Sequence, residues 1–207
     1  MPERAARPTR RFFATDAATL ARRLLGQRLV SVVGGHRTAG IIVETEAYLG
    51  IEDRAAHTYG GRRTARNASM WGPPGRAYVY LIYGMHCCVN VVAGDDNDPV
   101  AVLVRALRPE AGLATMRNRR TAARRDIDLC SGPGKLCQAM AIDRIADGAD
   151  LVRGSRLYLE QVRQRALPRR AIAVGKRIGV DYAGEWAQAE LRFAVRDDPN
   201  VSRPTPA

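Results

Sequence analysis

Short apolar runs separated by polar turns, a pattern typical of β-strands, recur along most of the 207-residue chain. The stretch "RLVSVVGGHRTAGIIVETEAYLG" (28–50) predicts two strands joined by a Gly-Gly turn. Two further runs meet in "YVYLIYGMHCCVNVV" (78–92), which predicts a hairpin, and "VAVLVRAL" (100–107) predicts another strand. Shorter strands are expected at "RLYLE" (156–160) and "LRFAV" (191–195).

Helical spacing of apolar residues is confined to a few segments. In "TDAATLARRLLGQ" (15–27), leucines recur at helical spacing, Thr15 or Asp16 is a candidate N-cap, and Gly26 is a candidate stop. A second helix is expected from about Pro109, inside an arginine-rich stretch.

A further helix is predicted in "CSGPGKLCQAMAI" (130–142), with Ser131 as its cap and Pro133 near its first turn. The chain shows no internal repeat and no linker that divides it. We therefore expect one α+β domain at 11–203, preceded by a disordered basic arm (1–10) and followed by a short tail (204–207).

The balance of charge narrows the classes of partner. Lysine and arginine together number 33 against 21 aspartates and glutamates, which gives a net charge of +12. Such a chain attracts polyanions, of which nucleic acid is the commonest, although a basic surface that only keeps the protein in solution is the alternative.

No stretch approaches the roughly 20 apolar residues of a membrane span, and the N-terminus lacks a signal-peptide core. We expect a cytoplasmic, nucleoid-associated protein of bacterial origin.

Cysteine and histidine usage argues against a metal centre. The four cysteines occur as a Cys87-Cys88 pair and as Cys130 and Cys137, and neither spacing is a zinc pattern. With only three histidines in the chain, we expect no metal and no cofactor, and we interpret the cysteines as buried free thiols.

Two carboxylates occupy "VETEAY" (43–48), inside a predicted strand. In a strand, Glu44, Glu46 and Tyr48 share one face, opposite the face of residues 43, 45 and 47. One interpretation is a half-exposed strand with charged outer positions. The other places a carboxylate on a cleft floor, where desolvation raises its pKa and makes it a stronger base. The spacing allows both.

The predicted hairpin carries unusual residues at its tip. Turn tips usually hold small polar residues, yet this one contains Tyr83, Met85 and His86. The residues between 51 and 77 form a long polar connection, of a kind that is more often functional than idle. Tyrosine rings can stack on a flat heterocycle, although tyrosines in strands are more often structural.

Five ordered blocks of the chain closely resemble one known family. They are "VETEAYLGIEDRAAHTYGGRRTARN" (43–67), "PPGRAYVYLIYGMHCCVNVV" (73–92), "VLVRALRPEAGLATMR" (102–117), "CSGPGKLCQAMAI" (130–142) and "RIGVDYAGEWA" (177–187). They are similar to the alkyladenine (3-methyladenine) DNA glycosylases of the single-domain type, not the helix-hairpin-helix type. The resemblance runs from about residue 10 to 200 and implies a curved, mainly antiparallel β-sheet surrounded by α-helices, with a protruding β-hairpin.

The resemblance also implies a reaction. Glu46 matches the family's catalytic carboxylate, which activates a water for attack on C1′ of a damaged nucleotide. The N-glycosidic bond then breaks through a transition state with oxocarbenium character. No amine nucleophile is implied, so the enzyme is expected to be monofunctional and to leave an abasic site. Cationic methylpurines are the expected substrates, while hypoxanthine and ethenoadenine are neutral and need more help at the leaving group.

Pocket and groove residues are carried over in the same way. The base pocket matches residues from four of these blocks, with aromatic walls and a gating asparagine: Tyr48, His57, Tyr80, Asn90, Arg105 and Ile178. Asn90 is implied to reject guanine by crowding its exocyclic amine, and Arg105 to lie near the flipped nucleotide's phosphate. Tyr83 matches the residue that fills the gap left by the flipped nucleotide, from the minor groove and flanked by Met85 and His86.

Several other features follow less directly. One known member has an aromatic residue at the position of His86, so the detail of groove contact differs here. Exposed arginines are candidate phosphate contacts: Arg62, Arg63, Arg66, Arg117, Arg119 and Arg120. The partner expected is double-stranded DNA with damaged purines, bound by a monomer.

Two rival hypotheses are a non-catalytic nucleic-acid binder on the same fold and an RNA- or ribosome-associated protein. The carboxylate and the hairpin tyrosine argue against them.

Overall fold

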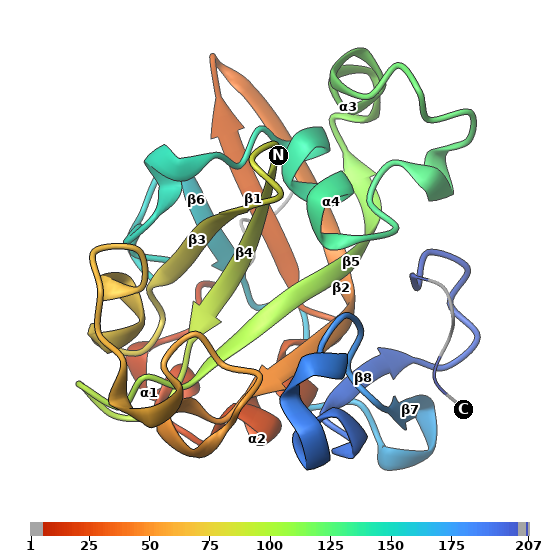
Figure 1. Cartoon of the computed structure of the whole chain (residues 1–207). Helices are drawn as coiled ribbons and strands as arrows, with labels where there is room; N and C mark the ends of the chain where they lie inside the picture. Colours follow the sequence, from red (N-terminus) through yellow and green to blue (C-terminus); the bar gives the residue numbers. More distant parts are fainter. Residues whose placement is uncertain (1–5, 203–205, 207) are drawn as a thin grey trace.

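Strand β2 (His36–Tyr48) is the centre of the sheet in the computed structural model, which describes residues 6–202 and 206. Strand β5 (Ala101–Ala111) pairs with β2 along one edge. Along the other edge, the first half of β2 pairs with β1 (Arg28–Val33) and its second half with β8 (Arg192–Val195). Because its two halves have different partners on that edge, β2 carries the sheet around a bend (Figure 1).

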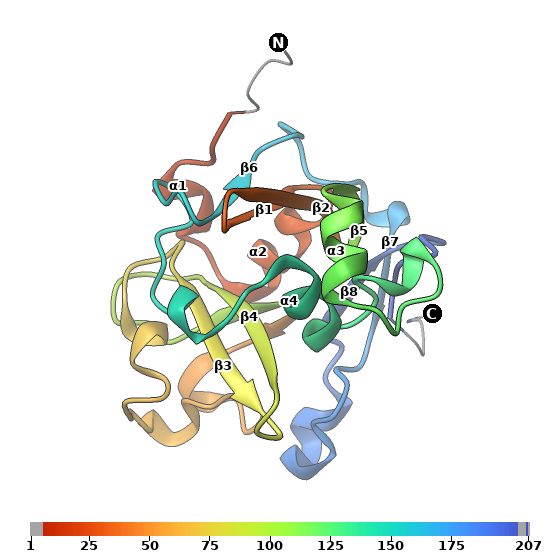
Figure 2. The same cartoon turned by 90° about the horizontal axis from the view of Figure 1, so that it is seen from above.

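The remaining strands extend the sheet outward from this centre. They are β3 (Ala77–Ile82), β4 (His86–Val92), β6 (Leu157–Glu160) and β7 (Ile172–Gly175). The order is β3-β4-β5-β2-β1-β6, with β7 attached to β8, and every pairing is antiparallel. The β3–β4 hairpin lies at an edge of the sheet and projects from the body of the molecule (Figure 2). The predicted α+β class, curved antiparallel sheet and protruding hairpin are confirmed.

Helices cover the sheet and fill its concave side. The α-helices are α1 (Arg10–Phe13), α2 (Ala17–Leu24), α3 (Leu113–Arg119) and α4 (Pro133–Met140). Short 3₁₀ helices occupy Gly50–Glu52, Tyr59–Gly61, Ala68–Trp71, Asp126–Asp128, Arg144–Ala146, Arg169–Ala171 and Asp181–Gln188. Helix α2 packs on β2, and α4 packs on β4 and β5. Their apolar faces and the strands share one core of fully buried leucines, valines and alanines.

The helix predicted within residues 15–27 has the expected ends. The Asp16 carboxylate accepts a hydrogen bond from the Thr19 N–H at 2.8 Å, so Asp16 is the N-cap. Gly26 follows the helix with φ +82°, a left-handed conformation that glycine adopts without strain. Local sequence was sufficient here, because both signals lie within one turn of the helix.

Two other predicted helix starts are wrong. Pro109 belongs to β5, where it pairs with Gly40, and α3 begins only after Gly112. Ser131 is not a cap either, because the N-cap of α4 is Gly132 and no side chain caps that helix. The Ser131 hydroxyl instead accepts a hydrogen bond from the Lys135 ammonium at 3.4 Å. In the first case, pairing with β2 extended the strand beyond the point at which local sequence suggested a helix.

The expected disordered arm does not extend to residue 10. The Arg7 guanidinium donates to the Gly154 carbonyl at 2.6 Å and lies 3.7 Å from the Tyr158 ring centroid. Arg10 starts α1 and pairs with Asp150 at 2.6 Å. Residues 6–10 are therefore packed on the domain, since their arginines find carbonyl, carboxylate and aromatic partners. The rest of the predicted arm lies outside the described residues, as does the predicted tail except for Pro206.

No helix within residues 6–202 is long and apolar enough to cross a membrane.

The turn before α3 offers a test of this architecture. Gly112 has φ +75°, and a Cβ there would lie 2.5 Å from the Arg37 carbonyl oxygen. We predict that Gly112→Ala lowers the free energy of unfolding by about 2–4 kcal/mol, since both strain and overlap with backbone are added. The matched control is Gly35→Ala, with φ +76° and no atom within 4 Å of its added Cβ, which should cost only about 1 kcal/mol. Equal losses of the two variants in chemical denaturation would contradict the packing constraint assigned to Gly112.

Candidate active site

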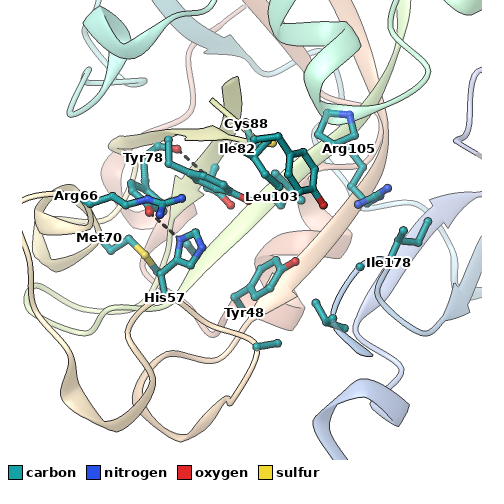
Figure 3. A pocket seen from close by; sticks show the side chains of 18 of the residues that line it. Tyr48, His57, Arg66, Met70, Tyr78, Ile82, Cys88, Leu103, Arg105 and Ile178 are labelled. Carbon is teal, nitrogen blue, oxygen red and sulfur yellow. Dashed lines mark hydrogen bonds between the residues drawn. The ribbon is translucent and has the colours of Figure 1, made fainter. Parts of the chain in front are cut away.

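A cavity of about 390 Å³ opens between the β3–β4 hairpin, the end of β2 and the segment after β7. Its walls include Tyr48 from β2, Tyr78 from β3, His57 from the long connection and Ile178 from the segment after β7 (Figure 3). Tyr182, from the same segment as Ile178, also lines it. The six residues predicted for a base pocket all line this one cavity: Tyr48, His57, Tyr80, Asn90, Arg105 and Ile178. Segments up to about 130 residues apart in the chain thus meet at one place.

Glu46 lies directly behind the floor of the cavity. One carboxylate oxygen, Oε1, accepts the Ile178 N–H at 2.8 Å and lies 3.3 Å from Arg105 Nη1. The other, Oε2, accepts the Tyr48 hydroxyl at 3.0 Å. Glu46 itself is fully buried, and its three partners line the cavity. A small molecule that reaches this carboxylate must therefore enter between those partners.

The half-exposed interpretation of residues 43–48 is wrong, because neither Glu44 nor Glu46 has any exposed surface. The predicted alternation holds in part. The Thr45 hydroxyl points to the opposite face and donates to the Ala21 carbonyl of α2 at 3.0 Å. Val43 departs from it, because Val43 packs in a separate cluster with Ile41 while Ala47 belongs to the main core. Register shifts on both sides of Glu44 interrupt the pairing with β5 at this point.

The same irregularity places Arg105. In β5, Ala106 pairs with Glu44 and Val104 pairs with Thr45, so Arg105 between them has no partner in the register. Such bulges redirect side chains and are common next to active sites. The Arg105 guanidinium reaches both carboxylates, with Nε 3.2 Å from Glu44 Oε1 and Nη1 on Glu46. Arg105 therefore bridges the two glutamates.

Glu44 was not predicted as a site residue, yet it anchors this cluster. Its Oε1 accepts from Arg105, from Arg192 Nε at 2.6 Å and from the Ser202 hydroxyl at 2.9 Å. Its Oε2 accepts the Ser202 N–H at 2.7 Å. A buried carboxylate with four donors is well satisfied, so Glu44 supports Arg105 from the side away from the cavity. The only signal in the sequence was its position two residues before Glu46.

Burial dominates the chemistry of Glu46. Desolvation raises the pKa of the Glu46 carboxyl above its ordinary value, while Arg105, the Ile178 N–H and the Tyr48 hydroxyl oppose that rise. Because the anion is destabilised relative to water but keeps hydrogen bonds, it is a stronger base than a carboxylate on the surface. Burial also raises the pKa of Tyr48, so its hydroxyl stays protonated and donates.

An aromatic cluster forms the opposite wall. His57 Nδ1 and the Tyr78 hydroxyl are 2.8 Å apart, and the His57 ring meets the Tyr80 ring edge-to-face with centroids 4.6 Å apart. Tyr78 and Tyr80 stack with centroids 5.4 Å apart. Tyr78 was not predicted as a pocket residue, although its period-2 relation to Tyr80 places both on one face of β3. The Asn90 amide donates to the Tyr78 carbonyl at 3.1 Å, which orients it beside this wall.

The hairpin tip is exposed, as its sequence suggested. Tyr83 is 84% exposed, Met85 is 71% exposed, and His86 is also exposed. Tyr83 has φ +53°, which is uncommon for a residue with a side chain. It also lines the cavity at its mouth. An apolar side chain held in solvent beside a cavity is suited to contact a partner surface.

The predicted phosphate contacts divide into two groups. Arg62, Arg63 and Arg66 are exposed in the long connection. The Arg66 guanidinium donates to the Leu81 carbonyl at 3.1 Å and lies 5.5 Å from the Tyr80 ring centroid at the cavity rim. Arg117 instead forms a two-bond pair with Asp126, and Arg120 donates to the Asp128 and Leu129 carbonyls. Arg119 belongs to the same group, since its guanidinium donates to the Ala139 carbonyl at 3.2 Å. The arginines of this second group therefore already have hydrogen-bond partners within the protein.

The thiols and possible metal ligands are the remaining reactive groups. All four cysteines are free, and three of them are buried while Cys87 is partly exposed. Within the described part of the chain, no group of three or more His, Cys, Asp or Glu side chains is arranged to hold a metal ion.

Comparison with known proteins identifies the family. The methylpurine-DNA glycosylase (MPG) family profile matches residues 11–199. The chain belongs to the methylpurine-DNA glycosylase family. The family resemblance predicted from the five blocks is therefore confirmed, and the matched residues include every part of the cavity described above.

Relatives within this family cover most of the chain. DNA-3-methyladenine glycosylase from Mus musculus is 48% identical over 200 residues, and the human enzyme of the same name is 48% identical over 201 residues. Each alignment covers 92% of this chain but only 60% of the mouse protein and 66% of the human protein. A relative from Desulfitobacterium hafniense is 44% identical over 200 residues, with 93% of this chain and 97% of the relative covered.

The histidine in the wall gives a testable prediction. Burial, then Arg66 and Arg62, lower the pKa of His57 from its ordinary value of 6.5. We predict a neutral imidazole at pH 7, with an NMR titration midpoint below 6.5 that rises in Arg66→Gln because a nearby cation is removed. The control is Arg37→Gln, an exposed arginine outside the cavity. A midpoint at or above the ordinary value, or no response to Arg66→Gln, would contradict the assignment.

Proposed function

We propose that this chain is a monofunctional DNA glycosylase of base excision repair that removes alkylated or deaminated purines from duplex DNA. Its substrates are 3-methyladenine and 7-methylguanine, with hypoxanthine and ethenoadenine as neutral substrates. The observation that carries this proposal is a fully buried glutamate held by three donors at the floor of an aromatic cavity. The names of the mouse and human relatives support the same reaction.

Glu46 is the general base in this proposal. A water admitted between Arg105 and Ile178 gives its proton to the Glu46 carboxylate and attacks C1′ of the extruded nucleotide. The N-glycosidic bond to the purine breaks, the purine leaves with the bonding electrons, and an intact abasic site remains. The carboxylate also stabilises positive charge that develops on the sugar ring, as in other glycosyl transfers.

The aromatic walls supply selectivity. A methylated purine carries positive charge, and its attraction to a well-placed tyrosine face is worth about 0.5–2 kcal/mol. Tyr48 and Tyr80 stand on two sides of the cavity, and burial keeps both hydroxyls protonated by raising the pKa of each. A neutral His57 can hydrogen-bond the edge of the base, and Asn90 crowds the exocyclic amine of guanine. Cationic bases are already good leaving groups, so little acid catalysis is required for them.

The hairpin is the wedge that opens the duplex. Extruding a nucleotide costs a few kcal/mol of stacking and pairing, which an inserted side chain partly offsets. Tyr83 enters the minor groove and fills the vacated space, with Met85 and His86 beside it.

Arg62, Arg63 and Arg66 contact the phosphates near the cavity, and Arg105 lies near the phosphate of the flipped nucleotide. Arg117 and Arg120 would have to exchange their present partners to join them. The protein acts as a monomer at the nucleoid.

The rival function is a binder of damaged DNA without catalysis. That function needs the basic rim and Tyr83, but it gives no reason to bury a carboxylate against Arg105 at considerable desolvation cost. The enzyme is therefore favoured, and removal of the base is the measurement that separates the two.

We predict that Glu46→Gln lowers the single-turnover rate of 3-methyladenine release by about 10²–10⁴-fold, because the amide cannot accept the proton. Binding to lesion duplex should stay close to wild type, since Glu46 is buried beneath the cavity surface. Glu190→Gln, at an exposed position, is the control. Base release by Glu46→Gln at the wild-type rate would refute the assignment, and no release by wild type would refute the enzyme.

Tyr83→Ala is expected to affect extrusion rather than bond cleavage. We predict about a tenfold loss of activity on a lesion in fully paired duplex, because the vacated space in the stack is no longer filled. The loss should be much smaller on a lesion placed in a bulge, where the nucleotide is already unstacked. A parallel measurement of both substrates decides the point, and equal losses on the two would overturn the role of Tyr83.

A further inference from the structure

Asp53 is a fully buried carboxylate outside the set of residues assigned to the reaction. It follows the 3₁₀ helix at Gly50–Glu52, between the end of β2 and the connection that carries His57. Its Oδ2 accepts the Leu49 N–H at 3.0 Å, and its Oδ1 accepts the Ala55 N–H at 3.0 Å. Asp53 therefore ties the end of β2 to the start of that connection.

Arg177 reaches Asp53 from the segment after β7. Its two terminal nitrogens donate to the two carboxylate oxygens, with Nη2 2.9 Å from Oδ1. The same nitrogens donate to the Ala47 carbonyl at 3.0 Å and to the Trp186 carbonyl at 3.3 Å. Both side chains of the pair have no exposed surface. One ion pair thus joins β2, the 49–57 connection and the 177–186 segment.

Two residues beside this ion pair, Tyr48 and Ile178, donate hydrogen bonds to the Glu46 carboxylate. The Arg177 guanidinium carbon lies 4.8 Å from the Tyr48 ring centroid, and Arg177 does not line the cavity, so it supports that ring from behind. Arg177 also directly precedes Ile178, whose N–H is 2.8 Å from Glu46. Tyr48 and Ile178, labelled in Figure 3, are therefore positioned by a single side chain.

Stability alone is a weak reason for such a pair. Taking two charges out of water offsets much of their attraction, and apolar residues of similar volume are often as stabilising. The Arg177 Nε is moreover buried without a hydrogen-bond partner among residues 6–202 and 206, which adds a desolvation cost. What the pair supplies is geometry, because a two-bond contact between a guanidinium and a carboxylate fixes both angle and distance.

We propose that the Asp53–Arg177 ion pair is a positioning device for the reaction: it fixes Tyr48 and the Ile178 N–H so that together they hold the Glu46 carboxylate in one orientation. The inference rests on the proposed function of Glu46 as general base. Asp53 and Arg177 act through these two neighbours and do not contact the substrate.

The proposal has a consequence for titration. The charged and titratable groups around Glu46 are Arg105 on β5, Glu44 and Tyr48 on β2, Tyr80 on β3 and Cys88 on β4. The hydrogen bonds from Ile178 and Tyr48 both lower the pKa of Glu46 against the effect of burial. If the ion pair is loosened, both weaken and this pKa rises. The base then becomes ionised only at higher pH, so the acid limb of the pH–rate profile moves upward.

The test compares wild type with Arg177→Lys and Asp53→Asn. Lysine keeps the cation but loses the two-bond contact. Asparagine keeps an acceptor for one of the two backbone N–H groups but loses the second acceptor and the charge. We expect each variant to lose about 100-fold in single-turnover base release, as for small misplacements of catalytic groups. Lesion-duplex affinity should change less than about threefold, because the hairpin tip and the exposed arginines proposed to contact the DNA do not touch the ion pair. The acid limb of the profile should move to higher pH in both.

Glu160→Gln is the matched control. Glu160 is also a buried carboxylate paired with arginines, Arg28 and Arg37, but it lies on β6 outside the cavity. This variant should lose stability without any shift of the acid limb. Each protein is measured well below its melting temperature, and if Asp53→Asn fails to fold, Arg177→Lys decides the question.

A second measurement separates this inference from the proposed function. In protein labelled with ¹³C at glutamate carboxyls, the Glu46 signal is assigned by its loss in Glu46→Gln and titrated without DNA. We expect its midpoint to rise in Arg177→Lys. If folded Arg177→Lys keeps the wild-type midpoint or the wild-type rate and acid limb, the positioning role is overturned. If wild type releases no base but the midpoint rises, the proposed function fails and the positioning role stands.

Discussion

The structure depends on the burial of two carboxylates in the middle of its central strand. Glu44 and Glu46 lie two residues apart on β2, neither has exposed surface, and both contact Arg105. Such a pair is tolerable only when cations and hydrogen-bond donors surround it. The arginines and the chain segments that supply these donors come from β5, β8 and the residues around 178 and 202. Satisfying the charges therefore imposes the arrangement of distant parts of the chain around β2.

The cavity is a product of the same constraint. Its floor consists of the groups that satisfy Glu46, and its sides are the hairpin and the long connection. The donor groups that permit burial of the carboxylate also orient it, so stability and chemistry are served by the same contacts. This explains why irregular segments such as 49–57 and 177–182 carry as much of the site as the regular strands do.

The sequence predicted correctly those elements of the fold that depend on interactions between residues close together in the chain. The hairpin, the cap at Asp16 and the strands of 28–50 were all visible, because alternation and turn residues act over a few positions. The family blocks identified the pocket residues, although the role of each stays a prediction. What failed was non-local: β5 extended through Pro109 by pairing with β2, and Arg7 docked on a distant loop. The strand pattern left open whether Glu44 was exposed or buried, since its donors are 61 to 158 residues away. Neither these contacts nor the bulge at Arg105 has a signature within a short window.

The position of Ser202 has a consequence for the order in which the protein matures. Ser202 supplies two of the donors to Glu44, from 158 residues further along the chain. Proteins emerge from the ribosome N-terminus first, and domains generally fold as units. A nascent chain that has exposed β1 to β5 already holds both glutamates but lacks Arg192, Ser202 and the Ile178 N–H. The two carboxylates thus lack several of their donors during most of synthesis, and the site proposed for the reaction is complete only when the fold is complete.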